Sequence, residues 1–412
     1  MRIWAFPSFY PYDYPGFKWS GIFAHRQYKG LVDSGAELCV VLPVMWHPVY
    51  PLSSIHPEWK QLQKLSYPRE RVYDGIKIYH PRVSNYKPNR FVKKSYSERY
   101  AESIINFFKD NKIKLNPSTD IFYSQWIPDA AFVQIAAKKL GIKSAVLAVG
   151  DDVIIWPNSK KENLAIFRQT IVNADIRLAV AGYLGDEANR LIGSDLPFEI
   201  VRRGVNYDFF KPGMNDEKQK IRKELGIPND KIVILCIGSA IVRKGWLDLF
   251  EALQEIKKTN KNFMLVGISG GDAAIDLDEA AKKYGLEGFF LNLGEVEPAK
   301  IANFYHCADI FCLPSHWEGI ANAVVEGMSS GLAVVTTNVS GHPELVTDGI
   351  TGILVPAKQP QILSEKLKEL INNEHLREVL GKNAREFIVN KWGNFAHNAA
   401  LLYRKLDETL LK

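Results

Sequence analysis

Short continuous apolar runs alternate with amphipathic segments along most of this chain. Residues 232–237, 310–313 and 333–335 are such runs, and their β-prone composition is typical of buried parallel strands. A polar or glycine-containing turn follows each of the first two runs, and a helix-type pattern follows the turn, as in residues 246–257. This repeated order predicts parallel sheets covered by helices, which is an α/β fold.

The first half of the chain shows the same alternation. The charged stretch 213–231, with its Pro and Gly residues, is typical of a domain boundary. We therefore predict two domains, residues 1–210 and 211–392. The predicted strands of the first domain are residues 2–6, 37–42, 120–123, 144–149 and 176–180, and a hairpin is predicted over 71–79 around Asp74-Gly75.

Composition excludes several classes of protein. The 412 residues are 46% hydrophobic and 24% charged, which is ordinary for a globular protein, and no apolar run approaches eighteen residues. The N-terminal residues 1–6 do not look like a signal peptide. Four cysteines lie in or beside apolar runs without zinc-site spacing, which favours buried thiols in a reducing cytoplasm. The net charge of +6 is modest.

The stretch after residues 310–313 carries the candidate chemistry. Glu318 and Glu326 are eight residues apart, roughly 800° of helix, so we expect both to face one side of a helix. The first N–H groups of that helix have no helical partner and form an anion site. They belong to Gly319, Ile320, Ala321 and Asn322. Carboxylates beside an anion site are expected to bind the hydroxyls of a sugar and of a ribose that are attached to the anion. The alternative is an ordinary first-turn acid and a solvated Glu326.

The order of these residues resembles the nucleotide-sugar site of the family-four glycosyltransferases, also called glycosyl transferases group 1. Glu318 and Glu326 are followed by small residues and by Gly341-His342-Pro343-Glu344. The resemblance implies the GT-B fold, with two Rossmann-like doubly wound domains facing a central cleft. It implies that the C-terminal helix, residues 393–412, crosses back to the first domain. It also implies that Glu318 contacts the transferred sugar and Glu326 the nucleotide ribose.

Residues 238–245, GSAIVRKG, resemble the phosphate-binding turn of the same family. Lys244 matches, whereas Ser239 stands where the family has Arg, and Arg243 lies beside Lys244. A cation here would neutralise a departing diphosphate, and the alternative is a lysine on an ordinary strand-to-helix turn. By resemblance, the donor-binding backbone includes Gly238, Ser239, Gly294 and Val296.

The aromatic loop 7–21 is the candidate acceptor side. A loop of this length is usually functional, and glycines let backbone approach a ligand. Its candidate residues are Gly16, Trp19 and Gly21. The family's first loop approaches the sugar diphosphate and the acceptor, whereas the alternative is an aromatic lid packed on the surface. Residues 149–153 line up with a family turn that commonly begins His-Gly, and Val149 replaces that His here. Asp151 and Asp152 are the candidates in this turn.

A basic and aromatic stretch covers residues 87–100. A solvated basic face is the default interpretation, and docking to an anionic membrane surface or a lipid-linked acceptor is the alternative. No nucleic-acid motif accompanies the stretch, so we expect no nucleic-acid partner. The expected location is the cytoplasm, with peripheral attachment to the inner face of the membrane as the alternative.

The predicted function is a retaining glycosyltransferase. By resemblance it moves a sugar from a UDP- or GDP-linked donor to a glycan, lipid-linked or small-molecule acceptor, forming an α-glycosidic bond in cell-surface polysaccharide or glycolipid synthesis. Neither cofactor nor metal is expected, because fixed cations replace the metal and no Asp-x-Asp pair follows a predicted strand. The alternatives are a non-catalytic nucleotide-sugar binder, an epimerase and a phosphorylase relative on the same fold.

Overall fold

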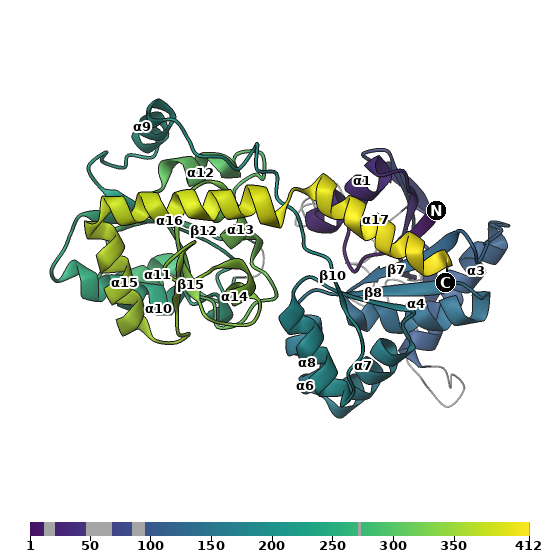
Figure 1. The fold of residues 1–412 in the computed structure, drawn as a ribbon. Helices are drawn as coiled ribbons and strands as arrows, with labels where there is room; N and C mark the ends of the chain where they lie inside the picture. The colour runs from purple at the N-terminus through teal and green to yellow at the C-terminus, as the bar shows by residue number, and fades with distance from the viewer. Residues whose placement is uncertain (12–20, 47–67, 85–94, 271–272, 412) are drawn as a thin grey trace, which may run out of the picture. The chain divides into compact units, whose positions relative to one another are not determined.

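The computed structural model describes the chain apart from residues 12–20, 47–67, 85–94, 271–272 and 412. Backbone contacts divide the chain into two compact units, residues 1–203 with 395–412 and residues 204–394 (Figure 1). The first break therefore lies between Arg203 and Gly204, earlier than the boundary that the charged stretch suggested.

The first unit is built on an eight-stranded sheet in the described part of the chain, with the order β10-β9-β8-β7-β1-β2-β5-β4. Its neighbouring strands are parallel except for the β4–β5 hairpin. Asp74 and Gly75 have φ angles of 47° and 78°, as both central residues of a type I′ turn require, so the predicted hairpin is confirmed. A separate two-stranded sheet pairs β3 with β6. The strands are β1 (Arg2–Phe6), β2 (Glu37–Val41), β3 (Val44–Trp46), β4 (Glu70–Tyr73), β5 (Ile76–Tyr79), β6 (Arg82–Ser84), β7 (Asp120–Gln125), β8 (Lys143–Ala148), β9 (Ile176–Ala179) and β10 (Glu199–Ile200).

The C-terminal helix α17 (Phe395–Leu411) packs on α1 (Ile22–Asp33) within the first unit (Figure 1). A Cβ atom added at Gly30 would lie 2.6 Å from the Cβ of Ala399, so glycine is needed where these helices touch. The end of the chain thus returns to the first unit, as the family resemblance implied. The other helices are α3 (Tyr96–Asp110), α4 (Ile127–Leu140), α5 (Asp151–Ile154), α6 (Trp156–Ser159), α7 (Lys161–Asn173) and α8 (Gly182–Ile192).

The second unit is built on a parallel six-stranded sheet with the order β13-β12-β11-β14-β15-β16. All residues of β14 and β15 are buried, which explains the continuous apolar runs of residues 310–313 and 333–335. The strands are β11 (Ile232–Ile237), β12 (Phe263–Ile268), β13 (Phe290–Asn292), β14 (Ile310–Leu313), β15 (Ala333–Thr337) and β16 (Ile353–Val355). The helices are α9 (Asn215–Glu224), η2 (Val242–Lys244), α10 (Trp246–Lys257), α11 (Leu277–Lys283), α12 (Ile301–Cys307), α13 (Asn322–Ser329), α14 (His342–Leu345), α15 (Pro360–Asn372), α16 (Glu374–Phe387) and η3 (Ile388–Trp392).

The charged stretch 213–231 lies within the second unit, as the predicted bounds 211–392 have it, and the break between the units precedes it, after Arg203. It contains α9, which belongs to the second unit. Lys218 Nζ and Arg222 Nη2 lie 2.5 Å and 2.6 Å from the carboxylate oxygens of Asp309, and Val233 donates its backbone N–H to the same group at 2.7 Å. Burial acts to raise the pKa of Asp309, but the charges of Lys218 and Arg222 outweigh it and hold the pKa below its usual value.

Replacing Asp309 with Asn is expected to destabilise the second unit by about 3–5 kcal/mol at pH 7, because Arg222 would keep a buried charge without its partner. The folded pKa of Asp309 is lower than the unfolded value of about 4, so its stabilisation is complete above that value. It is lost as the pH falls through the folded pKa. Melting temperatures of parent and variant should therefore differ at pH 7 and converge in acid. Glu369→Gln, which removes an exposed carboxylate, is the control.

In the described part of the chain, no helix is both long and apolar enough to cross a membrane. The four cysteines are free thiols, with Cys39 partly buried and the other three buried. Burial raises the pKa of Cys312 and Cys236 well above the usual thiol value. These thiols are therefore protonated packing residues, as the sequence predicted.

Candidate functional site

The candidate site is assembled from three turns at one edge of the second sheet. The turns follow β11, β14 and β15, which are neighbours in the sheet. Because parallel strands end at the same edge, these turns meet where ligands bind in open α/β sheets. The turn after β11 supplies Arg243 and Lys244, the turn after β14 supplies Glu318, and the turn after β15 leads into His342.

Glu318 is the centre of this site, with only 7% of its surface exposed. Lys244 Nζ is in direct contact with its Oε1 atom, and Arg243 Nη1 lies 3.3 Å from Oε2. Ser315 donates its hydroxyl to Oε1 at 3.0 Å. Burial acts to raise the pKa of Glu318, but the charges of Lys244 and Arg243 outweigh it and lower the pKa below its usual value. The site therefore holds an ionised carboxylate between two cations.

Two contacts fix the turn carrying the cations against the turn carrying Glu318. Gly245 has φ 72°, and a Cβ atom there would lie 2.0 Å from the carbonyl oxygen of Pro314. Only glycine fits the close approach of residue 245 to Pro314. The backbone N–H of His316 donates to the carbonyl of Arg243 at 2.7 Å. The His316 side chain is held by α10, where its Nε2 lies 2.8 Å from Asp248 Oδ2. The separation of Glu318 from the two cations is thus set by backbone packing.

Glu326 lies on α13, where its Oε2 accepts a hydrogen bond from the Tyr305 hydroxyl at 2.9 Å. Tyr305 is fully buried on α12 and packs against Phe311. The spacing argument for the two glutamates was wrong, because α13 begins only at Asn322, with Ala321 as its N-cap, and Glu318 lies in the turn before the helix. Of the four predicted backbone donors, only Asn322 lies within the helix.

The other predicted donor-side residues also lie at this sheet edge. Gly238 and Ser239 follow β11, and the carbonyl of Ser239 accepts a hydrogen bond from Trp246 Nε1 at 3.1 Å. Gly294 follows β13, with φ 62°, and its carbonyl accepts from the backbone N–H of Ser269 at 3.0 Å. Val296 lies two residues further along the same turn. The structure therefore gathers the second-unit candidates along one edge.

The first-unit candidates have mixed outcomes. Gly16 and Trp19 lie outside the described residues. Gly21 has φ 73° and precedes α1, and a Cβ atom there would lie 2.2 Å from the carbonyl oxygen of Phe9. Asp151 is partly exposed at the start of α5. Their roles toward an acceptor stay predictions.

Asp152 is fully buried, and its carboxylate holds its own turn together. It accepts backbone N–H groups from Val149 at 3.1 Å, Gly150 at 2.7 Å and Ile127 at 3.2 Å. Burial raises the pKa of Asp152 to about 6, against the opposing effect of these hydrogen bonds. These contacts give Asp152 a structural task that the sequence did not indicate.

Sequence reasoning missed the residues that orient the candidates. Tyr305, Asp248 and Ser315 act through contacts with residues far along the chain or in a turn, and no local pattern marks them. In the first unit, Asp129 accepts a hydrogen bond from Ser8, and burial raises the pKa of Asp129 to about 6. Three residues before Asp129, Trp126 has a φ of 81°, which is unusual for a residue other than glycine.

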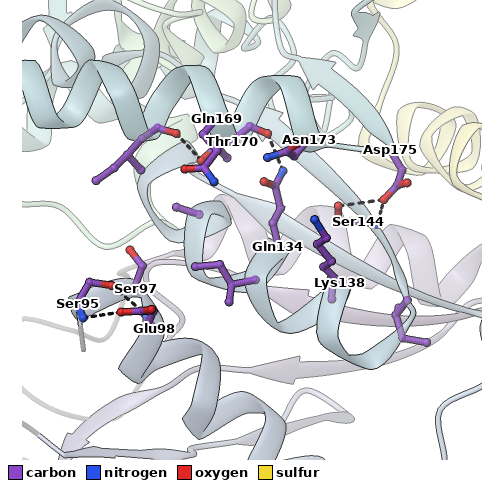
Figure 2. Close-up of a pocket in the computed structure, with 15 residues that line it drawn as sticks. Ser95, Ser97, Glu98, Gln134, Lys138, Ser144, Gln169, Thr170, Asn173 and Asp175 are labelled. Atoms are coloured by element: carbon purple, nitrogen blue, oxygen red, sulfur yellow. Dashed lines mark hydrogen bonds between the residues drawn. The ribbon is translucent and has the colours of Figure 1, made fainter. Parts of the chain in front are cut away.

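A cavity of about 680 Å³ in the first unit is not part of this site (Figure 2). It lies between α3, α4 and α7, beside Ser144 at the beginning of β8, which is the edge opposite the usual ligand-binding end. Gln134 donates to the carbonyl of Thr170 at 2.7 Å, and Ser144 donates to Asp175 at 3.1 Å (Figure 2). These polar groups already bond to one another.

Comparison with known proteins agrees with this geometry. Residues 217–387 match the family described as Glycosyl transferases group 1. The chain is 24% identical to the putative teichuronic acid biosynthesis glycosyltransferase TuaC of Bacillus subtilis (strain 168), over 89% of this chain and 88% of the relative. The chain therefore resembles the group 1 glycosyltransferases, and the matched residues lie within its second unit. The family inferred from Glu318, Glu326 and Lys244 is thereby confirmed.

Solved structures place this chain in the GT-B fold. Anabaena Alr3699/HepE, solved in complex with UDP and glucose, superposes with a TM-score of 0.75 at 16% identity, covering 99% of this chain and 100% of that chain. WaaG, a glycosyltransferase involved in lipopolysaccharide biosynthesis, superposes with a TM-score of 0.66 at 16% identity, covering 97% and 99%. The predicted GT-B fold is confirmed by this likeness.

Proposed function

We propose that this glycosyltransferase moves a sugar from a UDP-linked donor to a glycan or lipid-linked acceptor, with retention and an α-glycosidic product. The observation that carries the proposal is the buried Glu318 carboxylate held against Lys244 and Arg243 at the ligand-binding edge of the sheet. The choice of UDP is supported by the UDP bound to HepE. A cell-surface polysaccharide as product is supported by the name of the relative TuaC.

In this proposal the two cations bind the diphosphate of the donor. As the bond between the sugar C1 atom and the phosphate oxygen breaks, negative charge grows on the phosphate, and fixed cations stabilise that charge. The acceptor oxygen bonds to C1 from the same face, and its proton passes to the leaving phosphate. Arg243 and Lys244 carry the charge that a divalent metal would otherwise supply, so we propose a reaction that needs neither metal nor cofactor.

The two glutamates bind different parts of the donor in this proposal. Glu326 accepts hydrogen bonds from the ribose hydroxyls, and Glu318 contacts the transferred sugar. The contact between Lys244 and Glu318 means that a diphosphate must share Lys244 with this carboxylate. Arg243 and Ser315 remain beside Glu318 and keep it ionised.

Thermal unfolding in the presence of UDP, GDP and UMP tests the proposal. A ligand that binds only the folded state stabilises it by about 2.7 kcal/mol at one hundred times its Kd. We expect UDP to raise the melting temperature more than UMP does, because only UDP offers a diphosphate to Lys244 and Arg243. Equal effects of UDP and UMP would contradict the assignment of these cations. A larger effect of GDP than of UDP would mean that the donor carries guanine instead of uracil. Slow hydrolysis of a UDP-sugar without acceptor would separate an enzyme from a non-catalytic binder.

Replacing Tyr305 with Phe is expected to weaken UDP binding about 3- to 10-fold, with little change in kcat. The variant removes one hydroxyl that orients Glu326, and a hydrogen bond to a charged group contributes about 1.5–3 kcal/mol, shared here with other contacts of the carboxylate. Calorimetric titration with UDP measures the effect. Tyr284→Phe, a partly buried tyrosine of the same unit, is the control. An unchanged Kd in Tyr305→Phe would show that Glu326 needs no such support.

The acceptor is proposed to bind the first unit, through the turn that contains Gly21 and through Asp151. The basic stretch 87–100 remains a proposed contact with an anionic membrane at the cytoplasmic face, and its residues 87–94 lie outside the described part. Of its described residues, Tyr96 is exposed, and its ring lies tilted against the ring of Tyr100 with centres 4.3 Å apart. An exposed aromatic side chain within a basic stretch of the sequence supports such a surface contact.

A further inference from the structure

His342 is a fully buried residue at the beginning of α14, in the turn that follows β15. Its Nδ1 atom lies 3.0 Å from the hydroxyl oxygen of Thr336 and 3.2 Å from the carbonyl oxygen of Thr337. The imidazole ring is therefore held by its Nδ1 side against the end of β15.

These contacts decide which ring nitrogen carries the proton. The carbonyl of Thr337 can only accept a hydrogen bond, and the hydroxyl of Thr336 donates its one hydrogen to the carbonyl of Leu313 at 2.8 Å. Both partners of Nδ1 are thus acceptors, so Nδ1 carries the hydrogen and Nε2 carries a lone pair. Burial lowers the pKa of His342 to about 4, so the ring is neutral near pH 7.

Nε2 of His342 is buried and has no hydrogen-bond partner among the described residues. A buried acceptor without a donor costs free energy, so such a group calls for an explanation. The cost would be removed by a ligand that donates a hydrogen bond. Protonation is not the explanation, because the pKa is far below neutral.

The ring lies beside the catalytic candidates. Thr337 donates its hydroxyl to the carbonyl of Ser315, and the Ser315 hydroxyl donates to Glu318. Thr336 and Thr337 thus connect the ring to the turn that carries Glu318. The charges of Glu318 and Lys244 both act on His342, with Glu318 raising and Lys244 lowering its pKa. His342 therefore belongs to the same edge of the sheet as the diphosphate and sugar groups of the proposed donor.

We propose that His342 Nε2 accepts a hydrogen bond from one hydroxyl of the transferred sugar and so helps to select the donor sugar. This inference rests on the proposed function. Phosphate oxygens and the ionised Glu318 are acceptors and offer no hydrogen to Nε2. A sugar hydroxyl does offer one, and it lies next to the diphosphate in the donor.

A protein–ligand mutant cycle tests this contact. The parent and His342→Asn are titrated calorimetrically with UDP, UDP-glucose and the four monodeoxy analogues of UDP-glucose. Asparagine places an amide N–H near the position of Nδ1 and has no atom near Nε2, so it keeps the hydrogen bonds to Thr336 and Thr337. We expect UDP to bind both proteins equally and UDP-glucose to bind the variant about 3- to 10-fold more weakly.

One deoxy analogue should bind the parent about 3- to 10-fold more weakly than UDP-glucose does. The affinity of that analogue should not fall further in His342→Asn. His342→Gln, whose amide oxygen reaches the Nε2 position, should recover part of the sugar preference. If the Asn variant does not fold, the parent alone decides, because four analogues that bind like UDP-glucose would overturn the proposal.

Two other outcomes would also overturn the assignment of Nε2 to the sugar. Equal weakening of UDP and UDP-glucose in His342→Asn would mean that the ring supports the nucleotide side. An unchanged affinity for both ligands would mean that Nε2 meets a buried water only. Absence of UDP binding to the parent would instead contradict the proposed function itself, so the two failures are distinguishable.

Discussion

Replacing Lys244 with Ala is expected to lower kcat by about 10²-fold or more, as the loss of one fixed charge stabiliser does in other enzymes. The fold should remain, because Lys244 is only partly buried and Glu318 keeps Arg243 Nη1 at 3.3 Å and the Ser315 hydroxyl at 3.0 Å. The melting temperature without ligand should therefore change little. The stabilisation by UDP should fall strongly. Initial rates with a UDP-sugar and melting curves with and without UDP measure both effects.

Lys258→Ala is the matched control for this experiment. Lys258 lies at the end of α10, pairs with Glu255 at 2.6 Å and is exposed, so its loss should leave turnover unchanged. Near-normal turnover in Lys244→Ala would remove Lys244 from the catalytic site. A change in the ligand-free melting temperature as large as the loss of UDP stabilisation would assign Lys244 a structural role instead.

The sheet of the second unit was predictable because its strands are buried on both faces. Such strands carry apolar residues at every position, so β11 and β14 were located residue for residue, and α10 was bounded by the glycine before it. The strand order alone is enough to predict that the turns with the catalytic candidates lie at one edge of the sheet. Fold and family could therefore be predicted from local patterns and from the order of the motifs.

The contacts within the site were not predictable from local patterns. The charged residues of α9 marked a domain boundary, but nothing near Arg222 in the sequence indicates that its side chain binds Asp309. The helix geometry assumed for Glu318 failed because Ala321 is the cap of α13. Tyr305 and His342 orient or complete the site through contacts that only the fold creates. Residue type and motif order point to the candidate groups, whereas long-range packing decides which residues support them.

Replacing each of the two glutamates with Gln is expected to give opposite kinetic effects. In the proposed site, Glu326 binds the ribose, which does not change during the reaction. Glu326→Gln should therefore raise the donor KM and weaken UDP binding by about 10-fold, with a smaller change in kcat. The glutamine oxygen can still accept the Tyr305 hydroxyl, so the helix should keep its packing. Calorimetry with UDP and initial rates over a range of donor concentrations measure the two constants.

Glu318→Gln should lower kcat about 10²-fold and leave UDP binding equal or stronger. In the proposed site this carboxylate contacts the sugar, where positive charge develops as the bond to phosphate breaks. Its loss would also free Lys244 for the diphosphate. Glu369→Gln is again the control for removing one carboxylate from the surface. If Glu318→Gln loses UDP and Glu326→Gln keeps it, the two roles are reversed. If neither variant changes binding or turnover, the donor binds elsewhere. The sign of the UDP effect in Glu318→Gln is the most informative result. Loss of a carboxylate that competes for Lys244 and repels the diphosphate predicts tighter binding, whereas loss of a residue that only holds the fold predicts weaker binding.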